Sequence, residues 1–325
     1  MTIKKHGLCA IGNALVDILI QVDEAFLETN GILKGSMRLV DEAQANALYE
    51  KAPAAVELSS GGSAANTLSG FSSFGGKCAY LGRVGMDKFG EVFTHDLLAQ
   101  GISFSSGPSE HMSTGRCLVF VTPDAQRSMC TYLGAAAEFA PSDLDAEMIS
   151  SSGILYIEGY LFDKPAAQQA LVEASCIAKN ADNKVSVTLS DTFCVSRHRD
   201  AFWDLIESQV DYLFANEAEA KELCQTPNLD DCIGILRRKT ELAVITRGAL
   251  GAVVVYPGGC VEIPAYPPAQ VIDTTGAGDL FAAGFLYGLS ENKPLAECGR
   301  LGAMAASEVI SHFGPRPQKV LKSMV

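Results

Sequence analysis

The segment Val271–Asn292, VIDTTGAGDLFAAGFLYGLSEN, holds the residues best suited to chemistry. Gly276, Ala277 and Gly278 are small, so a ligand can approach the backbone closely. They open an amphipathic helix, whose first N–H groups and dipole favour an anion. Asp279, in the same turn, either stabilises the helix start or acts as a general base. As a base it would accept a hydroxyl proton while the N–H groups hold the phosphoryl group under attack.

Two further segments offer groups for a polar ligand. Gly61 and Gly62, in GGSAAN, precede a helix and permit close approach, while Asn66 offers both a donor and an acceptor. The alternative is a simple turn. Asn13 follows the first strand, and Asp17 comes four residues later. A carboxylate that accepts two hydrogen bonds can recognise a sugar diol, although a solvated loop acid is the alternative.

Two other strands end in polar residues. In NEAE, Asn216 could cap a helix with Glu219 completing a capping box. Alternatively, this pair could hold magnesium-bound water beside phosphates. Thr246 ends the strand AVIT and Gly248 comes two residues later, and this pattern is consistent with either a nucleotide site or a plain hairpin turn.

Short apolar runs alternate with amphipathic stretches along most of the chain. The expected strands are 7–11, 78–84, 154–158, 185–189, 212–215, 243–246 and 252–255. The expected helices are 64–74, 91–100, 165–180, 199–209, 217–224 and 229–239. This alternation predicts an α/β fold, a mainly parallel Rossmann-like sheet flanked by helices, with the ligand at the carboxyl ends of the strands.

Residues 15–40 and 111–133 break this rhythm. The first segment lacks a good helix, and the second reads as two strands around a turn at 122–124. We expect the two to pair into a small β-sheet lid that excludes water from the site. The alternative is two ordinary surface hairpins. The length of 325 residues is compatible with two domains, but we expect a single domain over 1–325 with this lid inserted.

Composition excludes several classes of protein. With 48% hydrophobic and 19% charged residues, the chain is not intrinsically disordered. A formal net charge of −13 argues against nucleic-acid or anionic-membrane partners. No apolar run is long enough to span a membrane. The ten cysteines are scattered without a CxxC, and no signal peptide is recognisable, so we expect reduced thiols and a cytoplasmic location.

Four motifs occur together and in one order: GGSAAN at 61–66, NEAE at 216–219, ITRGALG at 245–251 and DTTGAGD at 273–279. With them, essentially the whole chain resembles the ribokinase (PfkB-type) family of sugar and nucleoside kinases. The resemblance implies a ribokinase-like α/β core with a β lid, ATP as the phosphate donor and Mg²⁺ as the cofactor. It implies phosphorylation of a primary hydroxyl on a sugar-like acceptor.

The resemblance also implies roles for single residues. Asp279 is the base, and the backbone of 276–278 is the anion hole. The residues expected at the acceptor are Asn13, Asp17, Gly61, Gly62, Asn66 and Arg127, the last being a lid arginine that reaches the phosphates or the acceptor. Those expected at the nucleotide are Asn216, Thr246, Gly248 and Gly251. Glu219 would bind Mg²⁺ through water, and many members also bind a monovalent cation such as K⁺. Its candidate ligands are backbone oxygens of Asp273 and Thr275, and of Gly314 less directly.

The sequence also bears on which molecule accepts the phosphate. AIGNALVDIL at 10–19 and LSDTF at 189–193 look more like adenosine kinases than ribokinases or fructokinases, which implies the 5′-hydroxyl of adenosine. Phe120, Phe162 and Phe193 are candidates to sandwich the base. Alternatives are a sugar kinase for ribose or fructose and a catalytically silent sensor. A dinucleotide-binding oxidoreductase is disfavoured, because no GxGxxG motif follows the first strand of this sequence. Both a monomer and a homodimer are compatible with the family.

Overall fold

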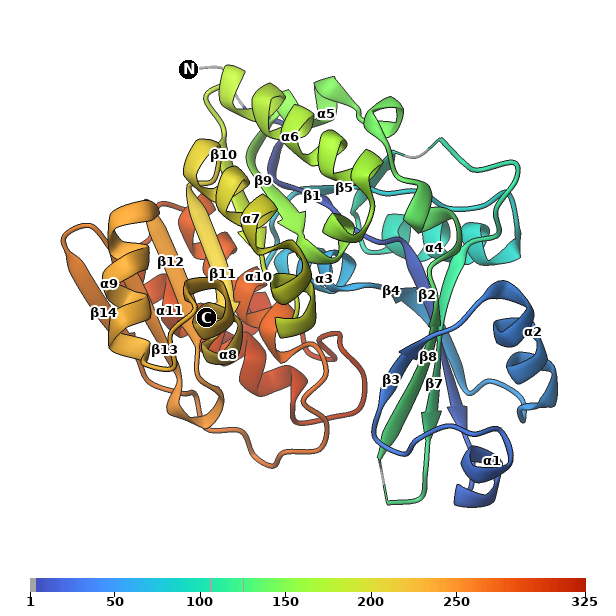
Figure 1. The fold of residues 1–325 in the computed structure, drawn as a ribbon. Coiled ribbons are helices and arrows are strands. Elements are labelled where there is room, and N and C mark those ends of the chain that lie inside the picture. The colour runs from blue at the N-terminus through green and yellow to red at the C-terminus, as the bar shows by residue number, and fades with distance from the viewer. Residues whose placement is uncertain (1–3, 106, 125) are drawn as a thin grey trace.

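The main sheet crosses the whole α/β body (Figure 1). In the computed structural model, which describes residues 4–105, 107–124 and 126–325, it has nine strands in the order β14-β13-β12-β11-β10-β9-β1-β5-β6. Their bounds are β1 His6–Ile11, β5 Cys78–Leu81, β6 Ser103–Ser105, β9 Ser152–Glu158, β10 Lys184–Thr188, β11 Tyr212–Asn216, β12 Leu242–Thr246, β13 Ala252–Tyr256 and β14 Gly259–Ile263. The seven strands from β12 across to β6 in this order pair in parallel, and only the pairings of β13 with β12 and of β14 with β13 are antiparallel. The expected mainly parallel sheet is confirmed.

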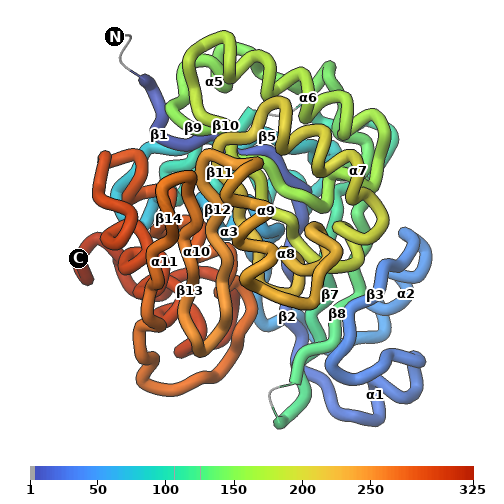
Figure 2. The backbone as a smooth tube through the Cα atoms, turned by 60° about the vertical axis from the view of Figure 1, so that its left-hand side comes forward, coloured from blue at the N-terminus to red at the C-terminus, as the bar shows by residue number. Residues whose placement is uncertain are grey.

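Helices cover both faces of this sheet (Figure 1 and Figure 2). Alternation along β1 explains why both faces are apolar: Leu8 and Ala10 belong to one core cluster, Cys9 and Ile11 to the other. The first cluster includes residues of α3 Ser63–Ser73, α4 Lys88–Ala99, α10 Ala277–Ser290 and α11 Leu295–Val309. The second includes residues of α5 Ala146–Ser150, α6 Pro165–Asn180, α7 Thr192–Ser208, α8 Glu217–Cys224 and α9 Leu229–Lys239.

A second, five-stranded sheet with the order β3-β8-β7-β2-β4 lies at one end of the main sheet (Figure 1). Its strands are β2 Leu15–Gln21, β3 Met37–Leu39, β4 Glu57–Gly61, β7 Gly115–Val121 and β8 Arg127–Tyr132, with α1 Glu24–Thr29 and α2 Glu42–Lys51 between them. Segments 15–40 and 111–133 therefore pair, as expected, rather than forming separate hairpins. Segment 15–40, which was expected to lack a good helix, contains the six-residue helix α1, because Asp23 caps it by accepting a hydrogen bond from the N–H of Phe26.

The two faces of the small sheet differ. Val16, Ile18 and Phe120 are fully buried on one face. Asp17 and Leu19 alternate with them and so lie on the opposite face. That second face borders a cavity of about 400 Å³, which is lined by Leu19, Val121 and Arg127 from the small sheet and by Phe313 from the C-terminal loop. The Asp17 face of the small sheet therefore looks toward the main body.

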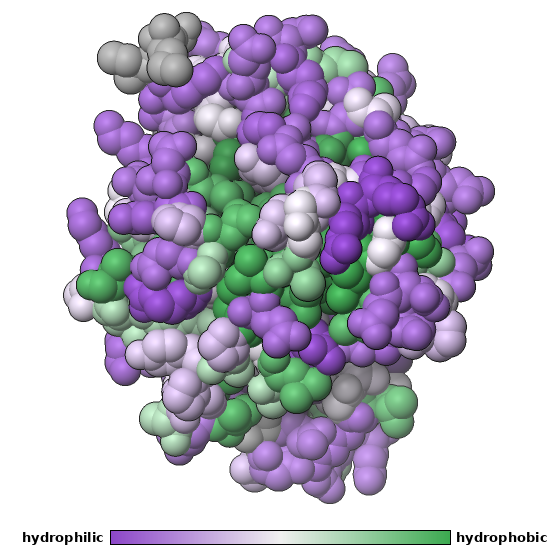
Figure 3. All heavy atoms as spheres, turned by 90° about the vertical axis from the view of Figure 1, so that its left-hand side faces the viewer, coloured by the Kyte–Doolittle hydropathy of each residue, from purple (hydrophilic) through white to green (hydrophobic). Residues whose placement is uncertain are grey.

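The surface on the side of β14 is mostly hydrophilic in its upper part, with apolar atoms exposed in its middle (Figure 3). Such scattered exposure is ordinary for a folded chain. Over the part of the chain that the structure describes, none of the helices combines the length and the apolar character that crossing a bilayer requires.

Candidate active site

Two segments far apart in sequence meet at Asp279. On α3, the Ser63 hydroxyl donates to Asp279 Oδ1 at 2.6 Å, and Asn66 Nδ2 donates to Oδ2 at 3.0 Å. Burial raises the pKa of this carboxyl, and the two donors oppose that effect. The result is an oriented carboxylate with raised basicity, which is what a general base needs. The GGSAAN and DTTGAGD motifs thus build one site, although Ser63 was not expected as a contact of the base.

The N-terminus of α10 begins beside Asp279. Its N-cap, Gly276, has φ +78°, and an added Cβ would lie 2.7 Å from the Pro315 carbonyl oxygen, so only glycine fits. The N–H of Ala277 donates to Thr274 O at 3.2 Å. No hydrogen bond from the N–H of Gly276 or Gly278 is found within residues 4–105, 107–124 and 126–325. Among the described residues, the amides of Gly276 and Gly278 are thus available to an anion, whereas that of Ala277 is engaged, and the three-residue anion hole stays a prediction.

Asp17 packs its carboxylate directly against Gly61, where any Cβ would overlap it. Burial raises the pKa of Asp17 to about 6, while Arg316 and Arg127 oppose the rise. Asp17 is therefore mainly ionised above about pH 6 and able to accept hydrogen bonds. Gly62, at φ +93°, likewise leaves no room for a side chain against the carbonyl of Asn13. The two segments around Asn13 and Asp17 and around Gly61 and Gly62, both expected at the acceptor, therefore lie in contact.

Glu158, at the end of β9, was not expected as a site residue. It is 1% exposed, and its Oε1 accepts hydrogen bonds from Asn13 N at 3.3 Å and Asn13 Nδ2 at 3.1 Å. Its Oε2 accepts from the N–H of Ala64 at 2.9 Å. Glu158 thus ties the end of β1 to the start of α3. An acid that ends the apolar run ILYIE was the one signal that could have found it.

Replacing Glu158 with glutamine should raise the KM for the acceptor about tenfold and leave the KM for ATP unchanged. Both carboxylate oxygens face N–H donors, so an amide must turn its NH₂ against one of them, at a cost of about 1–3 kcal/mol. Initial rates with each substrate varied would measure this. Equal rises in both KM values together with a lower melting temperature would show that Glu158 only supports the fold.

Asn216 and Glu219 form a capping box at the start of α8. Glu219 N donates to Asn216 Oδ1 at 2.8 Å, and Asn216 N donates to Glu219 Oε2 at 2.9 Å. Burial raises the pKa of Glu219 to about 7, with the hydrogen bond from the Asn216 N–H opposing the rise and the negative charges of Asp191 and Asp279 adding to it. The helix-cap interpretation is therefore correct, and three carboxylates also lie within electrostatic reach of one another. Within the described ranges, no group of three or more His, Cys, Asp or Glu side chains is placed to hold a metal directly.

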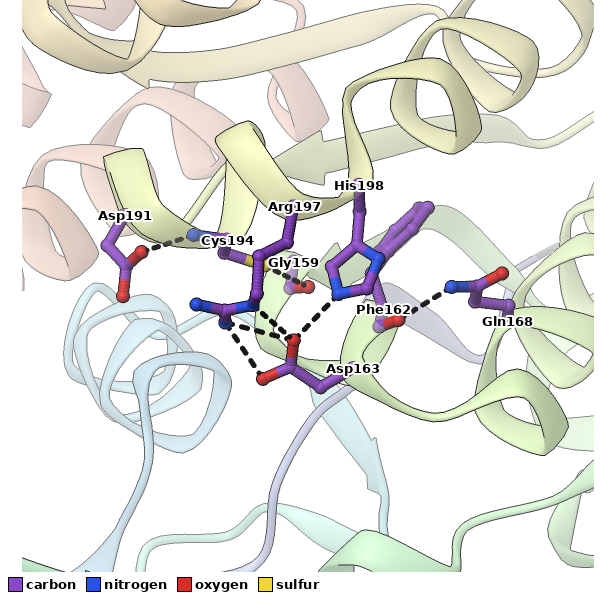
Figure 4. Close-up of polar contacts among 8 residues, drawn as sticks. All are labelled: Gly159, Phe162, Asp163, Gln168, Asp191, Cys194, Arg197 and His198. Carbon is purple, nitrogen blue, oxygen red and sulfur yellow. Dashed lines mark hydrogen bonds and ion pairs between the residues drawn. The ribbon is translucent and has the colours of Figure 1, made fainter. Parts of the chain in front are cut away.

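The loop after β9 is fixed against α7. Asp163 pairs with Arg197 at 2.9 Å and with His198 Nε2 at 2.7 Å, while Asp191 caps α7 by accepting from the N–H of Cys194 (Figure 4). In Figure 4 the Asp191 carboxylate lies apart from the Asp163 cluster. His198 also marks a kink, with φ −125° inside the helix. These contacts hold the carboxyl ends of β9 and β10 in place.

Arg127 from β8 reaches the loop before α10. It forms an ion pair with Asp273 at 2.8 Å, both side chains being at least nine-tenths buried. Asp273 also accepts from Thr275 Oγ1 at 2.7 Å and from Gly314 N at 3.0 Å. The Asp273 carboxylate is thus fully occupied, so a cation here could use only backbone oxygens. The expected cation ligands do lie together, and Arg127 connects the small sheet to them.

Asn216 and Thr246, two of the residues expected at the nucleotide, lie at the carboxyl ends of the neighbouring strands β11 and β12. Asn216 and Thr246 are partners in the β11–β12 register. Gly248 starts a short 3₁₀ turn, η4 Gly248–Leu250, and Gly251 adopts φ +82° at the head of β13. The hairpin interpretation of this segment is correct, and its turn is placed beside Asn216.

Comparisons with known proteins show the family of this chain. The family model described as pfkB family carbohydrate kinase matches residues 35–320. The chain belongs to the pfkB family. It is 28% identical to adenosine kinase of Saccharomyces cerevisiae over 95% of this chain and 96% of that protein. The structure of adenosine kinase from Sinorhizobium meliloti matches with a TM-score of 0.90 and 45% identity over 98% of both chains. A probable sugar kinase from Rhizobium etli matches with a TM-score of 0.91 and 41% identity over 99% and 98%.

As a pfkB-family member, the chain is a kinase that transfers phosphate to an alcohol group of a nucleoside or sugar. Two of the three aromatic residues expected at the base are buried in the structure, contrary to that expectation. Phe120 is fully buried in the small sheet, and Phe162, 3% exposed, stacks on Phe202 at 4.1 Å. Only Phe193, 74% exposed at the start of α7, is free to meet a ligand. Sequence could not separate these residues, because aromatic rings serve cores and ligand sites equally.

Proposed function

We propose that this kinase transfers the γ-phosphate of ATP to the 5′-hydroxyl of adenosine, with Asp279 as general base. The observation that carries the proposal is the placement of the Asp279 carboxylate. It is held by Ser63 and Asn66 of the acceptor turn, and it lies one residue from the free amide of Gly278. A hydroxyl between these groups could lose its proton to Asp279 while attacking a phosphoryl group bound by the amides of Gly276 and Gly278.

The Asp17 face of the small sheet favours a nucleoside over a small sugar. Residues in register across neighbouring strands share a face, so Leu39, Thr131 and Cys117 lie in one row with Asp17. The next row holds Met37, Met129, Val119 and Leu19. Met37 and Leu39 are 49% and 58% exposed. An apolar surface beside a carboxylate suits a flat base attached to a ribose diol.

The residues near Glu219 suit a hydrated Mg²⁺. Its two oxygens each accept one hydrogen bond from Asn216, and a carboxylate held in this way can contact a hydrated Mg²⁺ through water. The mutual repulsion of Asp191, Glu219 and Asp279 would be relieved by a divalent cation. When bound, Mg²⁺ supplies positive charge to the phosphates of ATP. The turn of Thr246, Gly248 and Gly251 beside Asn216 is the proposed place of the nucleotide.

The small sheet is proposed to act as a lid. Its Arg127 is held at Asp273, beside the start of α10, and stacks near Phe313 at 5.9 Å. The Arg127 guanidinium therefore lies at the wall of the site, over the loop proposed to bind the phosphoryl group. A covered site excludes water, which would otherwise compete with the acceptor hydroxyl for the phosphate.

A panel of acceptors assayed for ADP release tests the proposal. Adenosine should give a kcat/KM about 10–10²-fold above ribose and fructose, because burying the faces of a purine ring against apolar side chains contributes roughly 1.5–3 kcal/mol. Preference for ribose or fructose would favour the sugar-kinase alternative. Tight adenosine binding without ADP release from any acceptor would favour a silent sensor.

A further inference from the structure

The loop after α11 touches both halves of the proposed site. Gly314 N donates to Asp273 Oδ2 at 3.0 Å, and the Pro315 carbonyl lies against Gly276, the N-cap of α10. The next residue, Arg316, reaches in the other direction, to the edge strand β4 of the small sheet. Residues 314–316 therefore connect the phosphoryl-binding loop to the acceptor side of the site.

Arg316 forms a hydrogen-bond network with Asp96 and Ser60. Its Nη1 donates to Asp96 Oδ2 on α4 at 2.6 Å, and its Nη2 donates to Ser60 Oγ at 2.5 Å and to the main-chain oxygen of Ser60. Ser60, which is fully buried, donates from N at 2.8 Å and from Oγ at 2.6 Å to the same Asp96 oxygen. The guanidinium thus satisfies a carbonyl on an edge strand and fixes the position of Ser60.

Fixing Ser60 also fixes the contact between Gly61 and Asp17. Gly61 follows Ser60 and lies directly against the Asp17 carboxylate. Of the charged groups that face Asp17, Arg316 opposes the effect of burial most strongly, followed by Arg127 of β8. Asp279 of α10 and Glu57 of β4 act in the opposite direction, and the Cys117 thiol of β7 also faces Asp17. Arg316 is therefore the main positive charge acting on Asp17, the carboxylate proposed to bind the ribose diol.

We propose that Arg316 is a positioning residue for the acceptor: it holds the Ser60–Gly61 turn against Asp17 and places a positive charge near the carboxylate that binds the acceptor hydroxyls. This inference rests on the proposed function, because it takes Asp17 as the group that binds the ribose. Arg316 is assigned this role through Ser60 and Asp96, which its two Nη groups contact, while its Nε has no hydrogen-bond partner among the described residues.

The test is isothermal titration of adenosine into the full-length kinase between pH 5 and pH 9. Wild-type affinity should be present above about pH 6 and be lost as the pH falls through that value, because protonated Asp17 cannot accept two hydrogen bonds. In Arg316→Gln the midpoint should move up by about 1–1.5 pH units, which lowers affinity at pH 7 about 2- to 4-fold and lets it recover by pH 9. Arg316→Lys, which keeps the charge, should titrate near wild type.

Asp96→Asn is the matched control, since it disturbs the same network with the opposite change of charge. Its midpoint should stay at or below that of wild type. A wild-type midpoint in Arg316→Gln, or a loss of affinity that high pH does not restore, would overturn the proposed role of Arg316. Wild-type protein that neither binds nor phosphorylates adenosine would instead overturn the proposed function, and the same titration with the acceptor found in the panel would then decide the role of Arg316.

Discussion

Replacing Asp279 with asparagine is expected to lower kcat about 10²–10⁴-fold, the usual contribution of a positioned general base. The amide has the same shape but cannot take the hydroxyl proton. It can still accept from Ser63 Oγ, although its NH₂ would then face the NH₂ of Asn66. Steady-state ADP release with saturating adenosine and ATP measures the effect.

Adenosine binding serves as the control for this variant. Its Kd should stay within a few-fold of wild type, because Asp17 and the apolar face of the small sheet are untouched. Ser63→Ala, which removes one hydrogen bond from the carboxylate, should cost far less, about tenfold in kcat. A turnover of Asp279→Asn within tenfold of wild type would show that the base is another group.

Replacing Asp17 with asparagine should weaken adenosine binding about 10–10²-fold. A carboxylate that accepts two hydrogen bonds from a diol loses one of them as an amide, and a hydrogen bond to a charged group contributes roughly 1.5–3 kcal/mol. The loss of affinity near pH 6 should disappear, because the titrating carboxyl is gone. Titration calorimetry between pH 5 and pH 8 measures both effects, and the KM for ATP should not change.

Deoxynucleosides provide the matched control for Asp17. In the wild type, 2′-deoxyadenosine and 3′-deoxyadenosine should bind more weakly than adenosine. In Asp17→Asn the same deletions should cost less, because groups that contact one another are not additive. Full additivity of the two losses would place the diol away from Asp17.

The parts of the fold that the sequence predicts are those where one local pattern dominates. Buried parallel strands such as β9 and β12 are short apolar runs bounded by polar residues, and the helices between them are amphipathic. Strand β4, ELSSG, was missed because an exposed edge strand needs no apolar pattern. Helix α11 was missed because small residues form its contact with α10: an added Cβ at Gly302 would lie 2.7 Å from Phe281 O.

The residues of the candidate site likewise fall into those that a local motif predicts and those that only the folded structure brings together. Motifs that bind through backbone, such as 61–66 and 273–279, are visible because glycine is required at fixed spacings. Glu158 and Arg316 could not be predicted from the motifs, since each acts through partners far away in the chain. The pairing of Arg127 with Asp273 is likewise a tertiary contact, between β8 and the loop before α10.

The most direct test is a crystal structure of the kinase with adenosine, ADP, Mg²⁺ and aluminium fluoride as a mimic of the transferring phosphoryl group. We expect the adenosine 5′-oxygen within about 2.6–3.2 Å of an Asp279 carboxylate oxygen, and the mimic bonded to the amides of Gly276 and Gly278. A 5′-oxygen bound to a different residue, with the mimic away from the start of α10, would contradict the assignment of Asp279 as the base.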